Sequence, residues 1–315
     1  MRALVTGAAG FIGSHVVAAL VESGVQVRAF DRVSPVDLPG STEFAQGDLL
    51  DRAALRRALV GCDAVFHLAA LYSYSRADAD AMERVNVEGT RIVIEEAGAR
   101  RVVHTASSAT CGPVAGRAAT EADMPAAWEL RVPYKRTKLA GERLALQAAA
   151  RGANIVVVNP TTPVGPGDRR PTPTGKMVAD VASGRARAYL ARSALNIVAV
   201  EDVARGHLLA FEHGRVGQRY LLGGENVSMR EVFGAICEAV GRRAPTLAVP
   251  WPVAYGAAWI AARVQRNPKL LVLDEVRVAR WPMRFDDALA RAELGYTSEP
   301  AAAALARAAR AVASA

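Results

Sequence analysis

The stretch Thr6-Gly7-Ala8-Ala9-Gly10-Phe11-Ile12-Gly13 stands between a short apolar run and a segment of helical composition. Its glycines have the spacing GxxGxxG, which predicts a strand, a tight turn and a helix. In such a turn Gly7 permits the sharp reversal, Gly10 lets the backbone approach a pyrophosphate, and Gly13 allows close packing of helix on strand. The free N–H groups at the start of the helix then face the phosphates. The alternative is an ordinary strand-to-helix turn that binds nothing.

A carboxylate follows the second predicted strand, at Asp31, 18 residues after Gly13. At the end of that strand it can accept a hydrogen bond from a ribose 2′-hydroxyl and would repel a 2′-phosphate, which favours NAD over NADP. Arg32 keeps NADP possible, because a guanidinium can pair with a 2′-phosphate or stack on adenine. Asp48 follows the third predicted strand, where it can reach the adenine amino group or cap the next helix.

The first half of the chain alternates strands and helices beyond this turn. Further strands are predicted at residues 25–30, 44–46, 64–68, 102–106 and 154–159, and helices at 52–60, 79–98 and 134–151. Short β-branched runs separated by helices are typical of a parallel sheet covered on both faces. The predicted fold class is therefore α/β, a doubly wound parallel (Rossmann) sheet with a smaller, discontinuous C-terminal substrate domain.

The composition changes after Pro160, where residues 159–175 are rich in proline and glycine. This segment can be a plain linker or can lie against a ligand, because open α/β sheets bind ligands beyond the carboxyl ends of their strands. Residues 196–200 are expected to form one more strand that returns to the sheet. The predicted division is an NAD(P)-binding domain of residues 1–163 joined by about 196–214, and a substrate-binding part of residues 164–195 and 215–315.

Tyr134 and Lys138 stand four residues apart in a predicted helix, so their side chains share one face. Free tyrosine has a pKa of about 10, too high for a general base at neutral pH. A neighbouring ammonium and the positive charge of an oxidised nicotinamide lower that pKa. The phenolate can then take a proton from a substrate hydroxyl, and the phenol can protonate a ketone in the reverse direction. The alternative is a surface helix with a solvated lysine and a packed tyrosine.

The composition excludes several classes of protein. The 315 residues are 51% hydrophobic, which excludes a disordered or fibrous chain. The formal charge of +8 comes from scattered arginine pairs without an aromatic-rich basic stripe, which argues against nucleic-acid binding and leaves attraction to a small anion. Three distant cysteines, Cys62, Cys111 and Cys237, exclude a disulfide scaffold and indicate a reducing, cytoplasmic location.

The spacing of candidate ligands and the length of the apolar segments argue against a metal site and a membrane span. The five histidines and the cysteines lack metal-ligand spacing, so no metal is predicted, and His67 and His104 are expected to be satisfied core residues. No nucleophile elbow, phosphate-binding lysine loop or signal peptide is recognisable. The most apolar stretch, Val249 to Val264, is interrupted by prolines and too short to span a bilayer, so it is predicted to be a buried helix.

Taken in order, these motifs resemble the extended short-chain dehydrogenase/reductase family, in its NAD-dependent epimerase/dehydratase group. The resemblance covers nearly the whole chain, through TGAAGFIGSHV from Thr6, GDL at 47–49, HLAA at 67–70, NVEGT at 86–90, TASSATCG at 105–112, YKRTK at 134–138 and NPTTPVGPGD at 159–168. Three later segments are most similar to hopanoid-associated sugar epimerases, relatives of the dihydroflavonol reductase-like branch: PTPTGK, NIVAVEDVARGHLLA and YLLGGENVSM. The segment RFDDALARAELGY resembles the family's C-terminal substrate-domain signature.

The resemblance implies a role for each matching residue. Tyr134 would be the acid/base, Lys138 would bind the nicotinamide ribose and tune the tyrosine, and Ser107 would orient the substrate oxygen. Asn86 would support the active-site helix or the cofactor. The remaining cofactor contacts implied are Gly7, Gly10, Phe11, Ile12, Gly13, Asp31, Arg32, Asp48, Leu49, Leu68, Ala69, Ala70, Pro160, Thr161 and Thr162.

The leading hypothesis is an NAD-dependent epimerase of a sugar or nucleotide sugar, which oxidises a ring hydroxyl to a ketone and reduces it from the other face. Arg185, Arg187 and Arg192 would meet a diphosphate, or would be a solvated helix end. The alternatives are an NAD(P)H-dependent ketone or aldehyde reductase and a non-catalytic dinucleotide-binding sensor. The absence of an Asp-Glu pair after Ala106 argues against a dehydratase. The resemblance also implies a homodimer.

Overall fold

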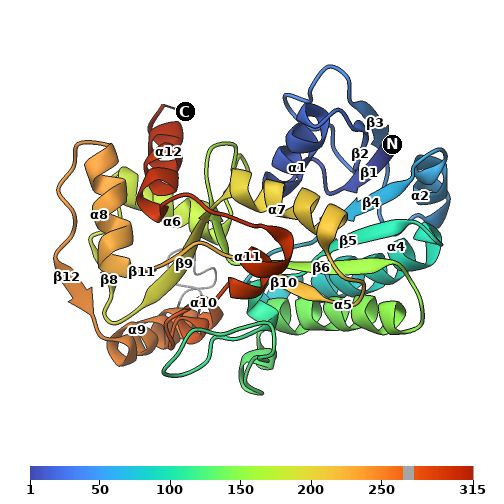
Figure 1. Cartoon of the computed structure of the whole chain (residues 1–315). Coiled ribbons are helices and arrows are strands. Elements are labelled where there is room, and N and C mark those ends of the chain that lie inside the picture. The colour runs from blue at the N-terminus through green and yellow to red at the C-terminus, as the bar shows by residue number, and fades with distance from the viewer. Residues whose placement is uncertain (265–272, 315) are drawn as a thin grey trace.

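The computed structural model describes residues 1–264 and 273–314 and has two lobes side by side (Figure 1). The larger lobe contains the N-terminus and the main sheet, and the smaller lobe contains most of the chain after residue 160. Residues 265–272 and 315 belong to the predicted substrate-binding part and lie outside the described residues. The division of the chain into domains stays a prediction.

The main sheet has seven parallel strands in the order β10-β6-β5-β4-β1-β2-β3. They are β1 (Arg2–Thr6), β2 (Gln26–Asp31), β3 (Glu43–Gln46), β4 (Ala64–His67), β5 (Arg101–Thr105), β6 (Ile155–Pro160) and β10 (Arg219–Leu222). The order runs outward in both directions from β1 and β4, so the sheet is doubly wound and the predicted fold class is confirmed. The switch in direction places the ends of β1 and β4 beside each other, where such sheets bind ligands.

Helices cover both faces of this sheet because its strands are apolar on both sides. One face holds α1 (Phe11–Glu22), α7 (Val200–His213) and α11 (Ala288–Leu294), and the other holds α2 (Arg52–Leu59), α4 (Gly89–Ala97) and α5 (Pro133–Ala150). Successive strand residues alternate between the faces, so Val5 and Val103 pack in one core while Leu4 and Val102 pack in the other. Ahead of α4 the chain forms α3 (Ala79–Met82) and a π-helical turn over Glu83–Glu88.

The smaller lobe has its own core around a three-stranded sheet, β11-β9-β7. Its strands are β7 (Thr162–Val164), β9 (Ala194–Ala199) and β11 (Glu225–Ser228), and its packed helices are α6 (Pro173–Ala182), α8 (Met229–Ala239) and α12 (Ala301–Ala313). A short pair, β8 (Ala188–Leu190) with β12 (Leu247–Val249), lies at its edge, followed by α9 (Trp251–Val264) and α10 (Leu273–Val278). The alanines of the C-terminal helix α12 pack into this core.

The predicted return of residues 196–200 to the main sheet is wrong. Strand β9 pairs with β7 and β11 in the smaller sheet, and β10, which was expected in the second domain, forms the edge of the main sheet beside β6. Both segments are short and apolar, and such a pattern does not reveal which strand is the partner. Helix α7, between these two strands, does lie against the larger lobe through its contacts with α1.

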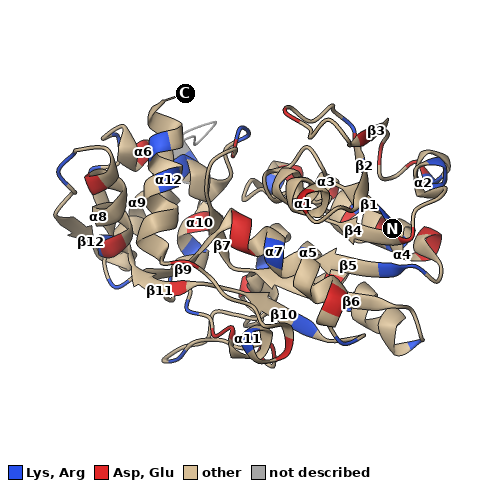
Figure 2. Ribbon diagram, turned by 45° about the horizontal axis from the view of Figure 1, so that its top comes forward, with Lys and Arg blue, Asp and Glu red and all other residues tan. Residues whose placement is uncertain are grey.

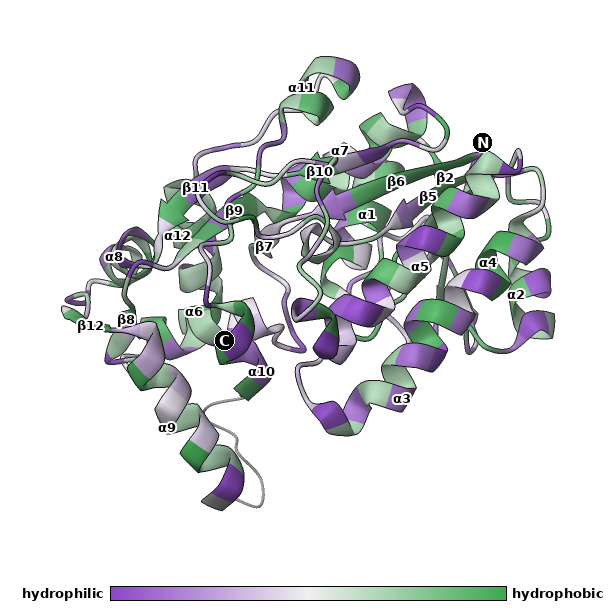
Figure 3. Ribbon diagram, turned by 90° about the horizontal axis from the view of Figure 1, so that it is seen from below, coloured by the Kyte–Doolittle hydropathy of each residue, from purple (hydrophilic) through white to green (hydrophobic). Residues whose placement is uncertain are grey.

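The predicted burial of the stretch from Val249 to Val264 is also wrong. Between Trp251 and Arg263 only Ala258 is buried, and α9 lies at the outer edge of the smaller lobe (Figure 3). Hydrophobicity alone suggested burial, but no other described element covers the outer side of this helix.

Charges of both signs are interspersed over both lobes, as Figure 2 shows. Many arginines are paired with acids, including Arg56 with Glu96 at 2.6 Å and Arg215 with Glu293 at 2.5 Å. The formal excess of eight positive charges is therefore spread over the surface rather than gathered in one stripe.

Candidate functional site

The glycine turn joins β1 to α1 in a conformation that only small residues allow. Gly7 has a φ of +72°, and a Cβ there would lie 2.6 Å from the backbone nitrogen of Ala69. A Cβ on Gly13 would overlap the carbonyl oxygen of Gly7. Gly10 is the N-cap of α1 and provides no side chain to cap the helix, so the first N–H groups of α1 are available to an anion. This cradle fits a pyrophosphate.

The predicted cofactor residues from β2 and β4 lie around the same turn. Asp31 ends β2, and its Oδ2 accepts a hydrogen bond from the N–H of Ala9 at 3.1 Å. Leu68, Ala69 and Ala70 follow β4, and the Leu68 N–H donates to the carbonyl of Thr6 at 3.1 Å. The ends of β1, β2 and β4 thus bring these residues to one edge of the sheet.

Asp48 and Leu49 lie after β3, beside this edge. The carboxylate of Asp48 accepts a hydrogen bond from the N–H of Leu50, whereas Asp51 caps α2 through the N–H groups of Ala53 and Ala54. The capping role considered for Asp48 therefore belongs to Asp51, and the adenine role of Asp48 stays a prediction. Leu49 is buried beneath Gly89 of α4.

Tyr134 and Lys138 lie in the first half of α5, with Ser107 at the end of β5. The Lys138 ammonium is buried and donates to the carbonyl oxygen of Thr105 at 2.7 Å. Burial lowers the pKa of Lys138 to about 8, while the nearby Glu142 carboxylate acts in the opposite direction. Burial also raises the pKa of Tyr134, and a hydrogen bond with Ser107 opposes that rise. We expected a net lowering of the Tyr134 pKa, but the desolvation of the phenol outweighs the protein groups around it.

Asn86 connects α5 to the segment after β4. Its Oδ1 accepts from the Leu71 N–H at 2.7 Å, and its Nδ2 donates to the Leu71 carbonyl at 3.0 Å and to Thr137 Oγ1 at 3.1 Å. Asn86 is buried in the π-helical turn, and both polar atoms of its side-chain amide take part in hydrogen bonds that hold the helix that carries Tyr134. This position fits the support of the active-site helix better than direct contact with a cofactor.

A buried carboxylate that was not predicted, Glu142, is the centre of a hydrogen-bond network in the site. Its Oε2 accepts from Thr110 Oγ1 at 2.6 Å and from Asn159 Nδ2 at 2.5 Å, and its Oε1 pairs with Arg219 at 2.5 Å. Asn159 Nδ2 also donates to the carbonyl of Ser107 at 3.1 Å. The network joins β5, α5, β6 and β10 and fixes the backbone of Ser107. Glu142 follows Lys138 by one helical turn, which is the signal that the sequence did offer.

A second buried ion pair fastens the loop that precedes α5. Lys135 Nζ lies 2.6 Å from Glu129 Oε1 and 2.8 Å from the carbonyl oxygen of Gly112, and both side chains are almost fully buried. Since Lys135 is the neighbour of Tyr134, this pair anchors the start of the active-site helix against the loop from Gly112 to Glu129.

Two further tyrosines stand beside Tyr134. The ring centroids of Tyr72 and Tyr134 lie 4.3 Å apart, and Tyr74 lies 5.6 Å from Tyr72 and 6.1 Å from Tyr134. Tyr72 is 39% exposed, so the cluster is in part open to solvent. Sequence reasoning missed both residues, although they follow the end of β4 in the run LYSYS and aromatic side chains there face the ligand edge of the sheet.

Helix α10 contacts the segment that follows these tyrosines. Asp274 forms a double hydrogen bond with Arg76, through Nε at 2.8 Å and Nη2 at 3.2 Å. Glu275 lies near Tyr72 and Tyr74, since its charge contributes to the raised pKa of each phenol. Burial raises the pKa of Glu275 itself. The surroundings of Tyr134 are thus rich in aromatic rings.

The segment after β6 crosses from the larger lobe to the smaller one beside the glycine turn. Pro160 ends β6, the Thr161 N–H donates to the Leu222 carbonyl at 3.2 Å, and Thr162 begins β7. Further along, His15 Nε2 lies 3.0 Å from the Pro166 carbonyl oxygen, and Arg169 pairs with an aspartate in the loop after β2, Asp37. These contacts hold residues 160–169, which we call the strap, over the edge of the sheet where the predicted cofactor residues lie.

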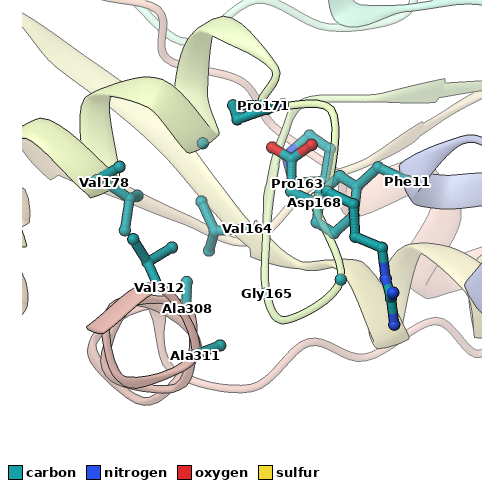
Figure 4. A pocket seen from close by; sticks show the side chains of 14 residues that line it. Phe11, Pro163, Val164, Gly165, Asp168, Pro171, Val178, Ala308, Ala311 and Val312 are labelled. Carbon is teal, nitrogen blue, oxygen red and sulfur yellow. The ribbon is translucent and has the colours of Figure 1, made fainter. Parts of the chain in front are cut away.

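A cavity of about 520 Å³ lies between this strap, α6 and α12 (Figure 4). Phe11 and Asp168 are on one side of it, and Val178, Ala308 and Val312 are on the other. Phe11 belongs to the glycine turn, whereas Tyr134 does not line the cavity. The cavity therefore adjoins the predicted cofactor region and lies apart from Tyr134.

The histidines and cysteines take structural places. His67 bonds to Thr6 Oγ1 at 2.8 Å and Thr90 Oγ1 at 3.1 Å, as a satisfied core residue should, but both ring nitrogens of His104 lack a partner in the described part of the chain. The expectation for His104 is therefore wrong. All three cysteines are free and buried, and the described residues contain no cluster suited to a metal. None of the described helices is long and apolar enough to cross a membrane.

Comparison with known proteins places these features in a family. Residues 3–223 match the model of the NAD dependent epimerase/dehydratase family. A putative dihydroflavonol 4-reductase from Synechocystis is 38% identical over 92% of this chain and 88% of its own length. Sterol demethylase protein B from Methylococcus capsulatus is 36% identical, over 97% and 96%. A farnesyl-dihydroquinoline-oxide ketoreductase from Stigmatella aurantiaca is 32% identical, over 94% and 92%.

Solved structures share the whole architecture. The crystal structure of gox2253 is 35% identical with a TM-score of 0.86, covering 99% of this chain and 98% of that one. A nucleoside-diphosphate-sugar epimerase from Pseudomonas aeruginosa is 26% identical with a TM-score of 0.81, covering 100% and 98%. MoeE5 in complex with UDP-glucuronic acid and NAD is 29% identical with a TM-score of 0.78, covering 98% and 99%.

Proposed function

The chain belongs to the NAD-dependent epimerase/dehydratase family and is an NAD(P)-dependent oxidoreductase of the extended short-chain type, and from that premise we propose that it interconverts a secondary alcohol and a ketone on a largely apolar carbon skeleton. The observation that supports this substrate class is the aromatic wall of Tyr72 and Tyr74 beside Tyr134. Ring faces bury apolar carbon well.

Each predicted residue has a specific role in this proposal. The glycine turn and the N-terminus of α1 hold the pyrophosphate, and Asp31 holds the adenosine ribose. A bound nicotinamide would supply the hydride exchange with the substrate and, in its oxidised form, a positive charge that favours the phenolate. Tyr134 moves the proton between its hydroxyl and the substrate oxygen, which Ser107 orients. Lys138 binds the nicotinamide ribose through an ammonium that Thr105 already positions.

An epimerase of a sugar or nucleotide sugar is the second candidate. The strap favours it, because an epimerase keeps its cofactor through both half-reactions and the contacts from His15 to Pro166 and from Arg169 to Asp37 lie over the cofactor edge. The likeness to a nucleoside-diphosphate-sugar epimerase points in the same direction. Against it, Arg185 is paired with Asp180 rather than gathered with Arg187 and Arg192 into a diphosphate clamp. A homodimer and a cytoplasmic location are the remaining parts of the proposal.

Substitution of the tyrosine tests the chemistry. Tyr134→Phe should lower kcat by about 10²–10⁴-fold, because the proton donor and acceptor is removed, with the affinity for NAD(P)H kept. Tyr189→Phe is the matched control, since Tyr189 packs against Phe233 in the smaller lobe and should keep full activity. Full activity in Tyr134→Phe would refute the assignment, and binding of NAD(P)H without any turnover would favour a sensor.

Measuring how much reduced cofactor is consumed distinguishes a reductase from an epimerase. The wild-type protein is incubated with hydrophobic cyclic ketones and with nucleotide sugars, using deuterated NADPH or NADH, and the absorbance of the reduced cofactor is followed. A reductase consumes reduced cofactor stoichiometrically and transfers deuterium to the ketone. Conversion of a sugar without net change in the cofactor would contradict our first proposal and establish the epimerase.

A further inference from the structure

Helix α9 presents an apolar face to solvent. Val253, Trp259 and Ile260 are 61%, 43% and 57% exposed. Arg263 is the one charged residue between Trp251 and Val264, and that segment contains no acid, amide, serine or threonine. Surface helices of globular proteins normally direct polar residues outward. This helix instead carries apolar residues on its outer side as well as on its inner side.

The orientation of this helix is fixed by its inner side. Trp251 Nε1 donates to the Val276 carbonyl of α10 at 2.8 Å, and the Trp251 and Tyr255 rings stack with centroids 4.9 Å apart. Positions on the opposite side are exposed, and we call them the α9 face: Pro252, Val253, Ala257, Trp259, Ile260 and Arg263. Figure 3 shows the helix extending outward from the smaller lobe.

One arginine belongs to the α9 face and another lies beside the start of the helix, and each lies against an aromatic ring. The guanidinium of Arg263 is 3.3 Å from the centroid of the Trp259 ring. Arg280 lies 5.4 Å from the Trp251 ring and 5.3 Å from Trp281, which is 37% exposed. The acids of α10 do not join these two arginines, because Asp274 is buried against Arg76 and Glu275 lies near the tyrosine cluster.

This composition identifies the occupant. Tryptophans and arginines around aliphatic side chains are typical of a helix that lies at the boundary between lipid headgroups and acyl chains. The arginines add attraction to anionic lipids. We propose that the α9 face docks on the surface of a bilayer that contains anionic lipids.

A second copy of the chain fits this face less well. The helix has 14 residues, so it is about 21 Å long and about 10 Å across. The surface area that it offers is therefore far smaller than the roughly 800 Å² per partner of a standard interface. Two copies of the face would also bring Arg263 and Arg280 against like charges, whereas anionic headgroups complement them.

Docking there places the substrate cleft beside the lipid. Helix α9 packs on α10, and Asp274 of α10 binds Arg76, two residues after Tyr74. A substrate dissolved in the membrane would reach Tyr134 along this side. That consequence rests on the proposed function, whereas the docking itself does not.

Sedimentation of the full chain with vesicles tests the proposal without using activity. The probes are vesicles of phosphatidylcholine with and without phosphatidylglycerol. The wild type should sediment with the anionic vesicles, and Val253→Gln with Ile260→Gln should weaken binding at least about tenfold. Val60→Gln with Val216→Gln, at sites 68% and 50% exposed outside α9, should bind as the wild type does. NADH affinity of all proteins reports folding.

Other outcomes decide against the proposal. Arg263→Gln and Arg280→Gln should each lower binding to anionic vesicles by about fivefold, and equal binding of these variants would remove the role of the arginines. Failure of the wild type to bind either vesicle would overturn the docking. A concentration-dependent dimer in analytical ultracentrifugation that Val253→Gln with Ile260→Gln abolishes would assign the face to a second copy instead.

Discussion

Tyr134 does not become a general base through protein groups alone. Its surroundings raise the pKa of the phenol, because burial among other rings disfavours the charged phenolate and the hydrogen bond with Ser107 opposes this only in part. The positive charge that favours the phenolate must therefore come largely from the oxidised nicotinamide when it is bound. The phenolate of Tyr134 would therefore be most populated only when the oxidised cofactor is bound.

The lowered pKa of Lys138 predicts a pH-dependent affinity for the cofactor. The ammonium is charged below about pH 8 and neutral above it, so hydrogen bonding and attraction to the ribose weaken as the pH rises. The Kd of NADH, measured by fluorescence, should therefore increase from about pH 7 to about pH 9. Lys138→Met should bind NADH weakly at every pH and lose this dependence. A wild-type Kd that stays constant over the range would contradict the role of Lys138.

At the scale of the element, α5 is the part of the fold that organises the site. Tyr134 and Lys138 lie on one face of α5, while Lys135 and Glu142 anchor the helix through buried ion pairs to Glu129 and Arg219. A helix that carries catalytic groups at adjacent turns must be held in rotation as well as in position. The ion pairs on its other sides hold it in this way.

Loss of one member of the buried ion pair should destabilise the protein strongly. Lys135→Met leaves the Glu129 carboxylate buried without its partner, which costs about 3–5 kcal/mol in the free energy of unfolding. The matched control is Lys176→Met, because Lys176 pairs with Asp180 on the surface at 2.9 Å and such pairs contribute about 0–1 kcal/mol. Urea titration measures both. Equal losses in the two variants would show that burial adds nothing to the first pair.

In the whole molecule, both lobes contribute elements to the region around the predicted site. The larger lobe provides the glycine turn, the tyrosine cluster and α5, and the smaller lobe provides α10 and the cavity next to the strap. The contacts between Arg76 and Asp274, and between His15 and Pro166, connect the lobes on two sides. The site exists only where the lobes are assembled.

The buried histidines predict a loss of stability in mild acid. Burial lowers the pKa of His67 to about 3 and that of His207 to about 4, against about 6.5 in the unfolded chain. Between those values the unfolded chain binds more protons, so the free energy of unfolding decreases as the pH falls from about 6.5. The Tm should drop between about pH 7 and about pH 5, less steeply in His207→Gln. His213→Gln, at an exposed site, should keep the wild-type slope.

The sequence by itself determined the features that depend on local spacing. The glycines at 7, 10 and 13 fit a turn that larger residues would block, and Tyr134 and Lys138 share a face because they are one helical turn apart. The alternation of apolar runs fixed the doubly wound class, since strands buried on both faces need helices on both sides. These are short-range rules, so they could be read along the chain.

Only the tertiary structure decided which distant segments meet. It placed β10 in the main sheet and β9 outside it, brought Tyr72 onto Tyr134, and gathered Asn159 and Arg219 around Glu142. It also left α9 exposed, although its composition suggested burial. The cause is the same in each case. The chemistry of an apolar or charged side chain indicates which kind of partner would stabilise it. Whether such a partner lies next to it depends on how the whole chain packs.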